Sequence, residues 1–202
     1  TLWRANAPSP YGWVESPVWS SDGSRLAFSV DFDGFPRNMF VASFAESGVI
    51  LQLVERQNGV TLGTSPVWMP DSHDLLYIAE RGTKRPLLQI ADVGHGQQGA
   101  TTELISGSLI CWDFDVARDA KEIVALVGSQ ITLTSVVHTT SDPSFVTIIA
   151  NPNSHVSDWD LPTIKTVQWE AKDGTTIEGV LELPRWFKAG RDAPLRMYVH
   201  LH

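Results

Sequence analysis

Residues 16–28 read SPVWSSDGSRLAF, and residues 65–77 repeat this pattern as SPVWMPDSHDLLY at an offset of 49 residues. The same offset relates the apolar segment 38–42 to segment 87–91, so the repeat extends beyond one short motif. A third and less similar copy, DFDVARDAKEIVA, occupies residues 113–125. A sequence repeat of this length indicates a stacked or radial array of one structural unit.

Each copy predicts two strands joined by a tight turn. Val18 and Trp19 favour a strand, and Asp22-Gly23 favours a turn because Asp bonds its own backbone and Gly accepts a positive φ. Residues 26–30 then alternate in the manner of a half-buried strand. No segment before residue 160 shows a helical apolar period. Strands, Gly/Pro/Asp turns and the 49-residue repeat together predict a β-propeller with about four strands per blade.

The pattern changes near residue 160, where the repeats end. Alternating apolar residues flank Asp173-Gly174, which predicts a hairpin, and the apolar segment 195–202 predicts a further strand. We therefore expect an all-β chain that begins as the C-terminal part of a longer propeller and ends as the truncated start of a second domain. The expected propeller part is 1–160, with repeats near 16–64, 65–112 and 113–160, and the second part is 161–202.

Composition excludes several classes of partner. The formal net charge is −8 and no basic run is present, so nucleic acid and anionic membranes are poor partners. The longest apolar runs are far shorter than the roughly 20 residues of a membrane-spanning helix. Cys111 is the single cysteine, which excludes an internal disulfide, and we expect it to be a small packed residue in a cytoplasmic protein.

Three further segments carry groups that could bind a ligand, but each pattern favours a structural role. The acidic turn 31–36 lacks the additional oxygen ligands of a calcium loop. The turn 81–86 holds three cations that could bind an acidic ligand, although a solvated loop is the simpler interpretation. The glycines of segment 94–99 lack the lysine and the helix of a phosphate-binding loop. We therefore expect no metal and no cofactor.

The order of these motifs resembles that of the prolyl oligopeptidase family of serine peptidases, with the acylaminoacyl-peptidase and dipeptidyl-peptidase V branch as the nearest likeness. The residues that carry it are the Ser-Pro-x-Trp-Ser-x-Asp-Gly repeats, then KDGTTIEG at 172–179, Leu183-Pro184, and a strand that ends in His202. The resemblance implies that His202 begins a His-Gly-Gly-Pro motif whose backbone contributes to the oxyanion site. It also implies that the chain continues into an α/β-hydrolase domain.

The resemblance further implies a function for the complete protein. Its serine nucleophile, aspartate and histidine would all lie beyond residue 202, and the propeller would limit access to short or N-blocked peptides. No G-x-S-x-G occurs in these residues, so no catalytic residue is assigned here and the 202-residue chain alone is expected to be inactive. A homo-oligomer of the complete protein is compatible with the sequence.

Two other functions compete with this one. His200 and His202 could share a strand face and bind zinc, although a catalytic zinc site usually needs three protein ligands. A non-enzymatic propeller that binds peptides or proteins would carry the same repeats, but would not need the different segment after residue 160. Inside the chain, Ser65, Ser129 and Ser154 lie in turn or loop contexts and are interpreted as structural.

Overall fold

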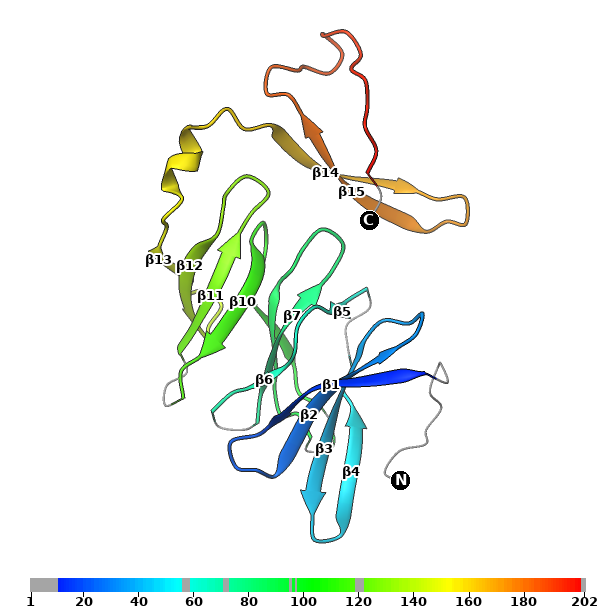
Figure 1. The fold of residues 1–202 in the computed structure, drawn as a ribbon, viewed down its shortest axis with the longest axis vertical. Helices are drawn as coiled ribbons and strands as arrows, with labels where there is room; N and C mark the ends of the chain where they lie inside the picture. The colour runs from blue at the N-terminus through cyan, green and yellow to red at the C-terminus, as the bar shows by residue number, and fades with distance from the viewer. Residues whose placement is uncertain are drawn as a thin grey trace.

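The computed structural model describes residues 11–55, 59–70, 73–94, 96, 98–118 and 122–200. The described residues are almost entirely strand and turn, as the sequence predicts, with one 3₁₀ helix and no α-helix among them. Three antiparallel sheets follow one another along the chain, and a two-stranded hairpin comes after them (Figure 1).

The first sheet is a simple meander in which each strand pairs with the next one along the chain. Its strands are β1 (Gly12–Trp19), β2 (Arg25–Phe32), β3 (Asn38–Ala45) and β4 (Gly48–Leu53). The predicted turn after β1 is present: Ser20 and Ser24 donate hydrogen bonds to the Asp22 carboxylate at 2.6 and 2.8 Å. These bonds, with the Ser24 amide, hold the Asp22 pKa well below its usual range.

The second and third sheets repeat this order. The second contains β5 (Thr61–Leu62), β6 (Val67–Trp68), β7 (Leu75–Glu80), β8 (Leu87–Ile90) and β9 (Thr101–Ile105). The third contains β10 (Ile110–Val116), β11 (Glu122–Gly128), β12 (Ser135–Thr140) and β13 (Thr147–Ala150). Since β5 and β6 both pair with β7, they act as one interrupted first strand.

The first strand of each sheet is irregular. The register of β1 against β2 shifts between Glu15 and Val18, β5 and β6 are separated by four residues, and β10 shifts between Cys111 and Asp113. These first strands begin at residues 12, 61 and 110, so successive sheets are spaced by 49 residues. The spacing found in the sequence is therefore the spacing of the sheets.

Equivalent positions of the first two sheets contact one another directly. The Ser65 hydroxyl donates to Ser16 Oγ at 2.6 Å, and the Ser21 hydroxyl donates to the Pro70 carbonyl at 2.7 Å. The Trp68 indole donates to the Val18 carbonyl at 3.0 Å. Contacts at a separation of about 49 residues are those that side-by-side copies of one unit make.

Most of the hydrophobic core lies between the sheets, while a smaller cluster around Phe32 and Phe40 lies within the first sheet. One cluster joins the first and second sheets through residues such as Met39, Val41 and Tyr77. Another joins the second and third sheets through residues such as Ile78 and Ile123. Alternate residues of β7 face opposite neighbours, which explains why five of its six residues are buried.

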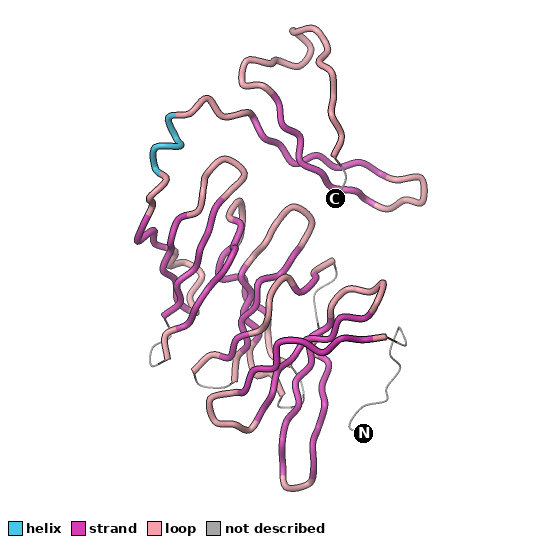
Figure 2. Tube along the Cα trace, viewed as in Figure 1, coloured by secondary structure: helices cyan, strands magenta, loops and turns pink. Residues whose placement is uncertain are grey.

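The hairpin consists of β14 (Thr163–Glu170) and β15 (Thr176–Leu183), and a connector with the 3₁₀ helix Ser154–Asp158 leads to it. The predicted Asp173-Gly174 turn is confirmed: the Asp173 carboxylate accepts the Thr175 amide at 3.0 Å, and Gly174 has φ of +83°. Figure 2 shows the hairpin lying beyond the upper ends of the sheets.

One segment that favours a strand forms none, and one predicted strand is wrong. The segment that favours a strand is 131–134, but the Ser129 amide donates to the Thr132 carbonyl across a turn, residues 133–134 belong to no strand, and the strand begins only at Ser135. Residues 195–200 are not paired as a strand, and Met197 and Tyr198 are exposed at 76% and 101%. An apolar segment becomes a strand only where its backbone pairs with another strand, and residues 195–200 pair with no strand among the described residues. Leu201 and His202 lie outside the described residues.

The two tryptophans at the same repeat position provide a matched test of the fold. Trp68 is 7% exposed and bridges two sheets, whereas Trp19 is 54% exposed and contacts Phe44 at 5.1 Å. Replacing Trp68 by Ala should therefore lower the free energy of unfolding by about 3–5 kcal/mol. Replacing Trp19 by Ala should lower it by only about 1 kcal/mol. Chemical denaturation of both variants checks this, and equal losses would contradict the inter-sheet role of Trp68.

Candidate functional site

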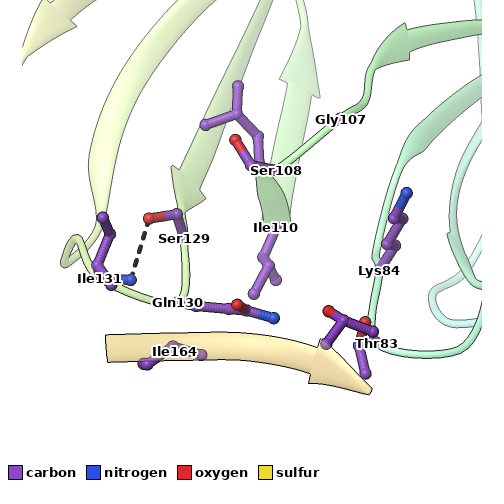
Figure 3. A pocket seen from close by; sticks show the side chains of 11 residues that line it. Thr83, Lys84, Gly107, Ser108, Ile110, Ser129, Gln130, Ile131 and Ile164 are labelled. Carbon is purple, nitrogen blue, oxygen red and sulfur yellow. Dashed lines mark hydrogen bonds between the residues drawn. The ribbon is translucent and has the colours of Figure 1, made fainter. Parts of the chain in front are cut away.

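A cleft of about 400 Å³ lies where the second and third sheets meet the hairpin (Figure 3). Its walls come from the β7–β8 turn, the segment before β10, the β11–β12 turn and β14. The lining residues are Thr83, Lys84, Gly107, Ser108, Leu109, Ile110, Ser129, Gln130, Ile131, Ile164 and Thr166. A concave site of this size with mixed apolar and polar walls is typical of small-ligand sites.

The β11–β12 turn forms the wall on the third sheet. The Ser129 hydroxyl lies 2.8 Å from Thr132 Oγ1 and accepts the Ile131 amide at 3.2 Å. Gly128 is closely enclosed, since a Cβ there would lie 3.2 Å from the Thr132 carbonyl oxygen and 3.3 Å from the Trp112 ring nitrogen. This tight turn fixes the backbone that presents Gln130 to the cleft.

The β7–β8 turn forms the wall on the second sheet. The backbones of Arg81 and Lys84 exchange hydrogen bonds at 3.0 and 3.1 Å. Between them Gly82 has φ of +58°, a conformation that glycine adopts without a steric penalty. The turn therefore projects Thr83 and Lys84 toward the hairpin.

Two of the three cations in this segment are engaged within the second and third sheets. Arg81 pairs with Glu103 at 2.7 Å, and the hydrogen bond that Arg81 donates to the Glu103 carboxylate raises the pKa of Arg81. Arg85 lies 3.8 Å from Glu80 and stacks on the Trp112 ring at 5.2 Å. The three cations of segment 81–86 thus do not converge on one acidic ligand.

A carboxylate is nevertheless bound at this turn, and it belongs to the hairpin. Glu178 on β15 accepts the Thr83 amide at 2.7 Å and the Thr83 hydroxyl at 2.8 Å. Its other oxygen accepts the Gln168 amide at 3.0 Å. The pKa of Glu178 lies below its usual range. The hydrogen bond from the Thr83 amide is the largest cause, followed by those from Gln168 and the Thr83 hydroxyl and by the charge of Lys84.

Gly82 leaves the room that this contact needs. A Cβ at residue 82 would lie 2.3 Å from Glu178 Oε1, so any other residue would displace the carboxylate. Apart from this contact and the cleft walls, β14 and β15 pack mainly against each other. The Thr83–Glu178 contact is therefore a principal attachment of the hairpin to the sheets.

The structure assigns no chemistry to the serines that sequence reasoning set aside. Ser65 bonds Ser16 across the sheets, and Ser129 is held inside its turn. Ser154 offers its carbonyl to Ser157 in the 3₁₀ helix. Of these, Ser129 alone lines the cleft. A structural role for each fits these contacts.

Cys111 is fully buried, and burial raises the pKa of its thiol to about 12. A thiol that stays protonated is a poor nucleophile, so the predicted packing role is confirmed.

The two histidines of the proposed metal or oxyanion motif do not define a site here. His200 is exposed, and His202, the one residue matched to the oxyanion motif, lies outside the described residues. Within the described ranges, no three His, Cys, Asp or Glu side chains gather as a metal site would require. The same ranges contain no helix that is long and apolar enough to cross a membrane.

Sequence reasoning missed the residues that build the cleft. Thr83 and Glu178 are 95 positions apart, and neither residue type is unusual in a turn or a strand. The one signal in the sequence is the position of residues 81–86 and 129–134, which lie in equivalent turns of successive repeats. Neighbouring repeats place equivalent turns side by side.

Comparison with known proteins identifies the fold. No family model and no curated protein matches the sequence, whereas solved structures do match. A serine-to-alanine variant of AtxE2 isopeptidase with Astexin3-dC4 bound has a TM-score of 0.61 at 12% identity, over 83% of this chain and 25% of that one. Prolyl oligopeptidase B from Galerina marginata has a TM-score of 0.57 at 11% identity, over 82% and 23%.

A third match is a protein assigned as TolB from Agrobacterium tumefaciens, with a TM-score of 0.51 at 11% identity, over 87% of this chain and 60% of that one. The chain thus spans about a quarter of the two peptidases. At these identities the likeness shows the fold alone, which is a propeller-like arrangement of antiparallel sheets.

The hairpin attachment predicts a dependence on pH. A carboxylate whose pKa is lowered in the folded state stabilises the docked hairpin above its ordinary pKa, and this contribution is lost as the pH falls through the lowered value. The Thr83 amide should therefore lose protection from hydrogen exchange as the pH falls below the ordinary value of 4.5. Amide exchange measured by NMR, relative to a control variant at each pH, checks this.

Glu178→Gln should abolish this dependence and lower the protection of Thr83 about tenfold at neutral pH, because a neutral oxygen accepts more weakly. Glu182→Gln, which changes an exposed residue on the same strand, is the matched control and should change neither. Equal protection of Thr83 in both variants would exclude the Glu178 attachment.

Proposed function

We propose that this chain is part of a serine peptidase of the prolyl oligopeptidase family that acts on short or N-blocked peptides. The observation that carries the proposal is the order of its parts. Propeller-like sheets are followed by a hairpin of different topology, with the KDGTTIEG segment at its turn and Leu183-Pro184 at its end. Two proteins with the same fold, an isopeptidase and a prolyl oligopeptidase, lend support.

In this proposal the catalytic groups belong to the complete protein. A serine on a strand-to-helix elbow attacks the peptide carbonyl, and a histidine oriented by an aspartate takes its proton and returns it to the leaving amine. The acyl-enzyme is then hydrolysed by water. His202 would begin the turn whose backbone amides stabilise the oxyanion, and residues 161–202 would begin the α/β-hydrolase domain.

The cleft between the sheets and the hairpin would then face the peptide. Its position at the junction of the two parts restricts the space for a ligand, which favours short peptides over folded proteins. Its lining offers aliphatic side chains such as Ile110 and Ile164 together with polar ones such as Gln130. A peptide carries both kinds of group.

A non-enzymatic binding propeller is the second candidate. The match to a protein assigned as TolB covers 60% of that protein, more than twice the share covered in either peptidase. A chain of that class would use the same sheets and would carry no nucleophile.

Labelling of the complete protein with a serine-directed phosphonate separates the two candidates. We expect a single labelled serine within a G-x-S-x-G sequence, and loss of peptide hydrolysis in the labelled protein. The isolated 202-residue chain contains no such sequence and is the matched negative control. Absence of labelling in the complete protein, with peptide binding retained, would reject the peptidase and support the binding propeller.

A further inference from the structure

Lys84 carries the only charge among the residues that line the cleft. The remaining lining residues are neutral, and four of them are aliphatic: Leu109, Ile110, Ile131 and Ile164. The net charge of the chain is −8, so its overall field repels anions. The charge of Lys84 is therefore a local feature of the cleft. It can attract an anionic ligand there, although the chain as a whole is acidic.

The surroundings of Lys84 leave its charge available. Arg81 and Arg85 are engaged with Glu103 and with Glu80 and Trp112. In the described part of the chain, no carboxylate lies within 4.0 Å of the Lys84 ammonium group. The charge of Lys84 contributes to the lowered pKa of Glu178. Both Glu178 oxygens, however, already accept hydrogen bonds from Thr83 and Gln168.

A second donor lies on the opposite wall. Gln130 lines the cleft from the β11–β12 turn, and in Figure 3 its amide extends toward the turn that carries Thr83 and Lys84. The turn bonds of Ser129 fix the backbone beside it. In the same view the Lys84 ammonium group points away from Gln130, so the two donors do not face one point. Lys84 is the donor suited to a carboxylate, because hydrogen bonds between charged groups are the stronger kind, and Gln130 is suited to a neutral peptide group.

We propose that the cleft binds short peptides through a carboxylate that Lys84 holds, while Gln130 bonds a neutral peptide group and the adjoining side chain packs on Ile110, Ile131 and Ile164. This inference rests on the proposed function, because it takes the ligand to be a peptide. The carboxylate can belong to the C-terminus or to an Asp or Glu side chain, since both present the same chemistry to Lys84.

Isothermal titration of the complete protein with three blocked dipeptides tests the proposal. The probes are N-acetyl-Ala-Leu, N-acetyl-Ala-Leu-amide and N-acetyl-Glu-Leu-amide. If phosphonate labelling finds a reactive serine, that serine is replaced by alanine so that no probe is consumed. Binding is thus measured whether or not the protein is a peptidase. Phosphonate labelling tests the peptidase proposal, and the titration tests the carboxylate site.

We expect at least one carboxylate probe to bind about tenfold more tightly than the neutral amide probe, since one charge-assisted contact distinguishes them. A preference for N-acetyl-Ala-Leu identifies a C-terminal carboxylate, and a preference for N-acetyl-Glu-Leu-amide identifies an acidic side chain. Lys84→Met should abolish the preference. Lys172→Met, which changes an exposed lysine in the hairpin turn, should retain it.

Three results would overturn the proposal. The carboxylate and amide probes could bind equally, or not at all. The Lys84→Met variant could keep the preference. It could also lose the hydrogen-exchange protection of the Thr83 amide, which would show that Lys84 serves the docking of Glu178 instead of a ligand.

Discussion

The Trp68 indole of the second sheet donates a hydrogen bond to the Val18 carbonyl of the first sheet at 3.0 Å. Val18 comes directly before Trp19, the residue that is equivalent to Trp68 in the repeat. Ser65 contacts Ser16 in the same way. The sheets stack only while equivalent residues stay in register, and this stacking creates the core. The central sheet has both faces covered, as the buried residues of β7 show, and stability in such arrays depends on neighbouring units.

Much of this arrangement could be predicted from the sequence because its signals are local or periodic. The offset between the two SPVW segments sets the spacing of the sheets, which begin at residues 12, 61 and 110. Asp22 and Asp173 form the turns that their sequences predict, since an Asp side chain bonds its own turn. These features need no knowledge of distant residues.

The rest could not be predicted because it depends on contacts between distant segments. Glu178 and Thr83 form a hydrogen bond although they are 95 positions apart, and neither local sequence predicts this pairing. The apolar pattern of 195–200 predicts a strand, but pairing also requires a neighbouring backbone. Residues 131–134 are β-branched or apolar and favour a strand, yet the hydrogen bonds of Ser129 close a turn there. Tertiary context and side-chain hydrogen bonding override propensity in these two segments.

The polar groups of the cleft come from turns, which differ in sequence from one repeat to the next. The turns at residues 31–37, 81–86 and 129–134 occupy equivalent places, between the second and third strands of a sheet. The first is acidic, with Asp31 paired to Arg37 at 3.5 Å, whereas the second presents Lys84 and the third Gln130.

The strands beside these turns must stay apolar to keep the sheets stacked, but the turns carry no such constraint. A rigid array with variable turns is a general means of placing binding groups. Docking of the hairpin on the second turn through Glu178 encloses the groups of the second and third turns in one cleft. The same contact that attaches the hairpin therefore brings the ligand-binding candidates together.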